Sequence, residues 1–151
     1  MLIRSIARRV FGTSSSETIA GDAALAALRA FVGFTFALAH GLGKVPPSEQ
    51  FTGFVGALGF PAPGLFAWAA GLSELVGGLL VAVGLATRPA AVAAAFTMAV
   101  AAFGAHASDP FAKKEPALLF LAFFAAFAVV GSGRFGLDAL VRARLDDGAA
   151  T

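Results

Sequence analysis

The chain has 151 residues, a formal net charge of +2, a mean hydropathy of +0.83 and charged side chains at only 13% of its positions. A soluble domain of this length needs far more polar surface, so the composition excludes an ordinary soluble enzyme and indicates an integral membrane protein. Cysteine is absent, which excludes thiol catalysis, disulfides and cysteine-ligated iron–sulfur or zinc sites in this chain. The few basic residues lie at the ends of apolar runs, which suits lipid headgroups better than nucleic acid.

The N-terminal residues 1–16 form a basic segment, and residues 17–151 are expected to be a single domain. Within residues 1–12, apolar side chains at helical spacing lie opposite three arginines, which predicts a short helix lying in the membrane interface. The alternative for this segment is a frayed basic tail. Asp22 is the expected N-cap of the first long helix.

Four apolar runs come next, and each is a candidate transmembrane span. They are residues 23–42, 65–86, 90–107 and 116–130. About 20 helical residues cross a bilayer core, so the fourth run is short when it is taken alone. The Gly- and Pro-rich loop 43–64 contains apolar residues at helical spacing over 51–58, which predicts a short re-entrant or interfacial helix.

The remaining segments connect the spans or close the chain. Residues 87–89 predict a tight turn, and residues 108–115 predict a polar loop before a helix that starts at Pro116. Residues 136–147 predict a second amphipathic helix. The expected fold is therefore all-α: a four-helix transmembrane bundle with short amphipathic interfacial helices at both termini.

Charge predicts the orientation of this bundle. Four spans place both termini on one side, together with seven arginines: Arg4, Arg8, Arg9, Arg88, Arg134, Arg142 and Arg144. The opposite side carries Lys44, Lys113 and Lys114. The positive-inside rule then predicts cytoplasmic N- and C-termini in a bacterial inner membrane.

Glu74 is the only charged residue of the second span, and a lone carboxylate there is costly unless it is protonated, paired or hydrated. Gly71, Gly78 and Val81 share its helix face, and the small residues permit another helix to approach closely. Glu74 is therefore expected to face the bundle interior. The first span carries a stripe at similar spacing, made of Arg29, Gly33, Phe36, His40 and Lys44.

These residues predict a buried polar chain. At the helical rise, Arg29 and Glu74 differ by about 7 Å in depth, so an extended arginine could form an ion pair with the carboxylate. A carboxylate beside an imidazole can pass protons, which makes Glu74 and His40 the candidate catalytic residues. The alternative is that the Arg29–Glu74 pair only sets helix register. The candidate binding residues are Arg29, Lys44, His106 and Trp68.

Aromatic residues predict where a ring could bind. The Phe-rich fourth span, with Trp68 and Phe66, offers an apolar slot for the ring and tail of a quinone, although packing or lipid contact is the alternative. His40 and His106 lie on different helices without ligand spacing, so no metal site is expected.

The same residues resemble those of the DoxX family of small bacterial membrane proteins, over about residues 27–140. The matching pieces, in order, are Arg29 with Gly33, His40-Gly41 with Lys44, Gly59-Phe60-Pro61-Ala62-Pro63, Gly71 to Glu74 with Gly77-Gly78, Gly84-Leu85-Ala86-Thr87-Arg88, His106, Glu115, Gly131-Ser132-Gly133-Arg134 and Leu137-Asp138. The resemblance implies a four-helix integral membrane protein. Some relatives are subunits of a thiosulfate:quinone oxidoreductase, and others are associated with membrane redox complexes and thiol stress. Most have no assigned activity.

The leading hypothesis is a redox-associated membrane subunit that binds a quinone or a similar lipid-soluble molecule in a polar pocket inside the bundle. Its partners would be the lipid bilayer, other membrane redox subunits and further copies of itself, with no nucleic acid. The alternatives are a non-catalytic structural subunit of a larger membrane complex and a small-solute carrier.

Overall fold

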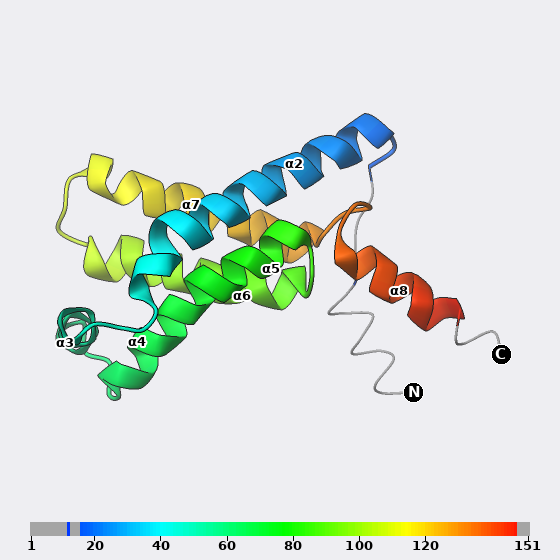
Figure 1. Ribbon diagram of the computed structural model, residues 1–151. Helices are drawn as coiled ribbons and strands as arrows, with labels where there is room; N and C mark the ends of the chain where they lie inside the picture. The colour runs from blue at the N-terminus through cyan, green and yellow to red at the C-terminus, as the bar shows by residue number, and fades with distance from the viewer. Residues whose placement is uncertain (1–11, 13–15, 148–151) are drawn as a thin grey trace.

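The computed structural model describes Gly12 and residues 16–147, and these residues form helices joined by turns, without a strand (Figure 1). The predicted N-terminal segment lies almost wholly outside the described residues. In chain order the helices are α2 (Ile19–Phe36), the π-helix η1 (Ala37–Gly41), the 3₁₀-helix η2 (Leu42–Lys44), α3 (Glu49–Ala57), α4 (Pro63–Leu72), the π-helix η3 (Ser73–Gly77), α5 (Gly78–Val83), α6 (Thr87–Val100), the π-helix η4 (Ala101–Ala105), α7 (Phe111–Val130) and α8 (Leu137–Asp147).

Several of these helices run on into one another as long rods. Three rods are long and apolar enough to cross a membrane: Ile19–Lys44, Pro63–Val83 and Thr87–Ala105. They correspond to the first three predicted spans. α7 has 20 residues, but its first turns carry Lys113, Lys114 and Glu115. Each of the three rods contains one π-helical turn, a feature that the sequence pattern did not predict.

The first helix is capped by a different residue from the one predicted. The side chain of Thr18 accepts a hydrogen bond from the Gly21 amide at 3.1 Å, as an N-cap does. Asp22 instead lies in the first turn, where its carboxylate accepts a hydrogen bond from the Ser16 amide at 2.7 Å. The predicted Asp22 cap is therefore wrong by one helical turn.

Two predicted connections are also corrected. The chain reverses at Gly84 and Ala86, both with positive φ (74° and 46°), and residues 87–89 form the first turn of α6 rather than the turn itself. Only glycine adopts such a backbone without strain, and Gly84 lies where the reversal begins. The predicted polar loop 108–115 is shorter, because α7 begins at Phe111 and contains Pro116.

Small residues allow the first two rods to touch along their backbones. A Cβ atom added to Gly33 would lie 2.6 Å from both the Ala82 nitrogen and the Gly78 carbonyl oxygen. A Cβ atom on Gly78 would lie 3.0 Å from the Ala37 nitrogen. The contact between α2 and α5 therefore depends on glycine at both positions, as in other close helix pairs in membranes.

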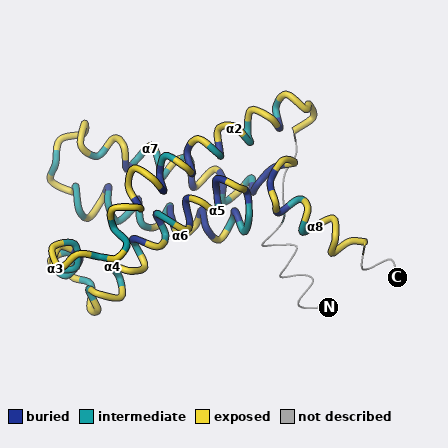
Figure 2. Tube along the Cα trace, viewed as in Figure 1, coloured by how far each residue is buried: buried dark blue, intermediate teal, exposed yellow. Residues whose placement is uncertain are grey.

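The core lies where α2, α5, α6 and α7 meet, and the outer faces of these helices are exposed (Figures 1 and 2). Phe36, Phe124 and Val81 are completely buried there. Large apolar side chains also cover the outside, including Phe31 and Val129, which are 70% and 74% exposed. An apolar outer surface on apolar helices requires hydrocarbon around it, so this is a membrane protein in contact with lipid.

A first prediction concerns the glycine contact. The Gly33→Ala substitution should lower stability by about 1–3 kcal/mol, because the methyl group meets backbone atoms that cannot rotate away. Gly53→Ala, in the middle of α3 with open space around it, is the matched control and should be neutral or stabilising by about 0.5–1 kcal/mol. Thermal unfolding of both variants in the same detergent measures the difference, and equal midpoints would contradict the proposed packing.

Candidate functional site

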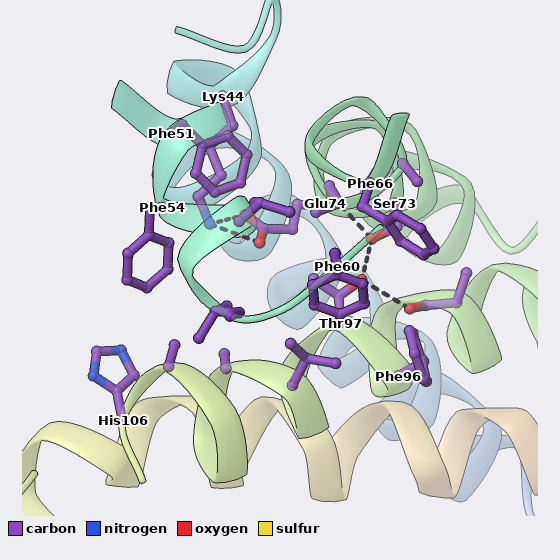
Figure 3. Close-up of a pocket in the computed structure, with 18 residues that line it drawn as sticks. Lys44, Phe51, Phe54, Phe60, Phe66, Ser73, Glu74, Phe96, Thr97 and His106 are labelled. Atoms are coloured by element: carbon purple, nitrogen blue, oxygen red, sulfur yellow. Dashed lines mark hydrogen bonds and ion pairs between the residues drawn. The ribbon is translucent and has the colours of Figure 1, made fainter. Parts of the chain in front are cut away.

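A cavity of about 470 Å³ lies between the α3 and α4–η3 segments on one side and α6–η4 on the other (Figure 3). Its walls are mostly apolar. The polar side chains that line it are Lys44, Ser73, Glu74, Thr97 and His106. Two of the three π-helical turns, η3 and η4, contribute residues to these walls, and such turns occur often at functional sites.

Glu74 forms its ion pair with Lys44. The Lys44 ammonium donates to the two carboxylate oxygens at 2.6 and 2.7 Å (Figure 3). The Glu74 side chain is only 2% exposed, whereas the Lys44 side chain is 33% exposed, so the carboxylate is the buried partner. The cavity therefore contains a paired charge, which satisfies the requirement that a carboxylate within an apolar helix has a partner.

Two glycines bring Lys44 to this position. A Cβ atom on Gly71 would lie 2.7 Å from the Lys44 carbonyl oxygen, and one on Gly41 would meet the backbone of Leu75 and Glu74. The end of the first rod can therefore lie directly on the second rod. This close approach sets the ammonium against the carboxylate.

A pair of hydroxyl groups joins the second and third rods beside Glu74. The oxygens of Ser73 and Thr97 lie 2.6 Å apart. Ser73 also lies 3.0 Å from the Ala70 carbonyl oxygen, and Thr97 lies 3.1 Å from the Ala93 carbonyl oxygen. Hydroxyls that bond back to their own helix are common where water is scarce.

Phenylalanine rings make up much of the apolar wall. The members of this aromatic wall are Phe51, Phe54, Phe60, Phe66 and Phe96. The Phe60 and Phe66 rings pack with centroids 4.6 Å apart, and the Lys44 ammonium lies 5.5 Å from the centre of the Phe51 ring. A cation at that distance from a ring face is attracted to it, so the charged and aromatic parts of the cavity are continuous.

His106 lines the cavity next to the α6–α7 connection. Its Nδ1 atom lies 2.8 Å from a carboxylate oxygen of Asp109, and the Lys113 ammonium lies 3.5 Å from the other oxygen. The hydrogen bond to His106 lowers the pKa of the Asp109 carboxyl below its usual value, and Lys113 adds to the effect. Asp109 therefore holds the imidazole in place beside the cavity.

Arg29 is a correction to the expected site. Instead of meeting Glu74, its guanidinium donates to the Val81 and Ala82 carbonyl oxygens at 2.5 and 2.6 Å. Its side chain is buried at the end of the bundle where α8 docks, and a Cβ atom on Gly84 would lie 2.8 Å from its Cζ atom. The predicted Arg29–Glu74 ion pair is not formed.

At the α8 end, the buried side chain of Asp138 joins α8 to the start of α6 through hydrogen bonds. Asp138 is completely buried and accepts hydrogen bonds from the Ala86 and Thr87 amides at 2.6 and 3.0 Å. Its own amide donates to the Gly84 carbonyl oxygen at 2.8 Å. Asp138 thus satisfies the free amides at the start of α6 and fixes α8 to the bundle.

His40 and Trp68 lie outside the cavity. The exposed His40 ring packs edge-on against Phe120, with centroids 5.2 Å apart. Trp68 is 45% exposed on α4 and does not line the cavity. The Phe-rich fourth span does not line this cavity. Phe124 and Phe127 are buried in the core, and Phe120 and Phe123 line a separate hollow of about 380 Å³ against α2. Lys44, Glu74 and His106 are the predicted site residues that the structure brings to one cavity.

Rods long enough to cross a bilayer, an apolar outer surface and a partly open cavity that holds an ion pair define an integral membrane protein with a ligand-sized candidate site. The family model described as DoxX matches residues 24–107, which is more than half of the chain. The chain belongs to the DoxX family. The match runs from α2 to just past η4 and therefore contains every residue that lines the cavity. Neither the search of curated proteins nor that of solved structures returned a match.

A second prediction concerns the asymmetry of the ion pair. Lys44→Met leaves a buried carboxylate without a partner and should cost about 3–5 kcal/mol of stability, whereas Glu74→Gln leaves an ammonium that can still reach water and should cost less. The double variant should be more stable than Lys44→Met alone, because it removes the unpaired charge. Thermal unfolding in detergent tests the order, and a more damaging Glu74→Gln would contradict it.

A third prediction concerns pH. Because the folded pKa of Asp109 is lowered, its contribution to stability is complete above the unfolded pKa and is lost as the pH falls through the folded value. His106→Ala should move the carboxyl titration upward, toward that of free aspartate. A ¹³C NMR titration of labelled aspartate measures this shift, and an unchanged midpoint would show that the hydrogen bond to His106 does not lower the pKa of Asp109.

Proposed function

We propose that this DoxX-family protein binds a lipid-soluble, ring-bearing molecule of the quinone class in the cavity, as a redox-associated subunit of the bacterial inner membrane. The observation that carries the proposal is the combination of five phenylalanine rings with the Lys44–Glu74 ion pair, whose carboxylate is buried, in one space. Ring faces pack on aromatic walls, and a few placed polar groups fix the orientation of the ligand.

The size and the composition of the cavity agree with such a ligand. A volume of about 470 Å³ falls in the range of small-molecule sites. A strongly hydrated solute would lose its water shell against walls that are mainly phenylalanine and alanine, whereas a ring with an alkyl tail would not. The carrier hypothesis relied on Arg29 beside Glu74, and Arg29 lies at the other end of the bundle.

The membrane arrangement is part of the proposal. We take α7 as the fourth span, because its 20 helical residues are long enough and it packs along α6. The start of α2, the α5–α6 turn and α8 then lie on one side, as Figure 1 shows them at one end of the molecule. The arginines near that end favour a cytoplasmic location for it, with α8 in the membrane interface.

A fourth prediction tests the proposed cavity. Purified protein in lipid nanodiscs should bind decyl-benzoquinone in at least one of its two oxidation states, and Phe54→Ala should weaken binding about two- to tenfold through loss of ring contact. Phe103→Ala is the matched control, since Phe103 is 66% exposed and does not line the cavity. Isothermal titration calorimetry, with empty nanodiscs as the reference, measures the binding affinity of both variants. Equal binding by both variants and the unaltered protein, or no binding at all, would remove the cavity assignment.

A further inference from the structure

The hydroxyl pair beside Glu74 has no proton left to offer a ligand. Ser73 and Thr97 carry one hydroxyl proton each. The 2.6 Å contact between their oxygens requires one of these protons, since two lone pairs would otherwise face each other. The other proton has a helix carbonyl within reach, that of Ala70 or that of Ala93. Both protons are committed in either arrangement, so the pair presents only lone pairs to the cavity.

The ion pair adds little donor capacity. An ammonium carries three protons, and two of those on Lys44 point at the Glu74 oxygens. The third is the one proton that the pair has left for a ligand. The ionised carboxylate of Glu74 is itself an acceptor. The polar part of the wall formed by these two pairs is therefore rich in acceptors and poor in donors.

We propose that the cavity selects the hydroxyl-bearing form of its ring ligand, a phenol or quinol, over the corresponding carbonyl or ether form. The ligand hydroxyl donates to the Ser73–Thr97 pair while its ring packs on the aromatic wall. A ligand with only carbonyl or ether oxygens meets lone pairs at the Ser73–Thr97 pair and forms no hydrogen bond there, so it depends on the single remaining Lys44 proton and binds less tightly than the hydroxyl form. This inference rests on the proposed function, because it concerns the occupant of the same cavity.

The test compares two probes of similar shape, 4-heptylphenol and 4-heptylanisole, by calorimetry with the 151-residue protein in nanodiscs. The phenol is expected to bind about tenfold more tightly than the ether, as one well-formed hydrogen bond provides. The Ser73→Ala/Thr97→Val double variant should reduce that ratio to near one by weakening phenol binding alone. Both residues must be substituted, because either hydroxyl oxygen alone can still accept a hydrogen bond from the phenol. Thr35→Val is the control, because it removes a hydroxyl from α2 that lines the separate hollow beside Phe120, and it should leave the ratio unchanged.

The outcomes separate this inference from the proposed function. Binding of both probes with equal affinity, or a tighter ether, overturns the selectivity while the cavity remains a ring-binding site. A phenol preference that survives in the double variant also overturns it, because the acceptor would then be another group. Binding of neither probe, together with none of decyl-benzoquinone in either oxidation state, overturns the proposed function itself. Near-ultraviolet circular dichroism of each variant confirms that it is folded before it is titrated.

Discussion

The burial of one carboxylate inside an apolar rod is the constraint on which the site depends. Glu74 is stable there because the Lys44 ammonium reaches it, and the ammonium reaches it because Gly41 and Gly71 let two backbones touch. Ser73, the neighbour of Glu74 in the chain, meets Thr97 of the third rod. Polar groups that lipid cannot solvate are thus gathered at one level of the bundle, where the cavity forms.

Periodicity predicted one of the two polar faces correctly. Gly71, Glu74, Gly78 and Val81 share a face in the sequence, and all four are buried. The stripe of the first rod divides between two neighbours. The rings of Phe36 and His40 both pack against Phe120, with centroids 5.0 and 5.2 Å away, whereas Lys44, which follows the π-helical turn η1, lies over Glu74.

The aromatic wall could not be assigned from the spans alone. Phe51 and Phe54 belong to a short helix that the sequence predicts, but its position over the cavity depends on how the loop 43–64 returns to the bundle. The sequence offered the phenylalanines of the fourth span as a slot, with packing as the alternative. Phe124 and Phe127 do pack in the core, whereas Phe120 and Phe123 line a separate hollow. Spacing indicates which face of a helix is apolar, and only tertiary packing decides whether that face meets lipid, another helix or a cavity.

The two ends of the bundle use polar side chains in opposite ways. At the α8 end, Arg29 and Asp138 satisfy backbone groups of the α5–α6 hairpin, and the hydrogen bonds of both side chains go to main chain. Such contacts fix the relative positions of the helices and leave few hydrogen-bonding groups for a ligand. At the other end the polar side chains bond to one another as well as to helix carbonyls, and the rods there depart from α-helical geometry in η1, η3 and η4. Side chains paired with side chains can exchange partners when a ligand enters, without opening a helix. The proposed ligand site therefore lies where the side chains of Glu74 and its neighbours are paired, while the hydrogen bonds of Arg29 and Asp138 to main chain hold the helices together at the other end.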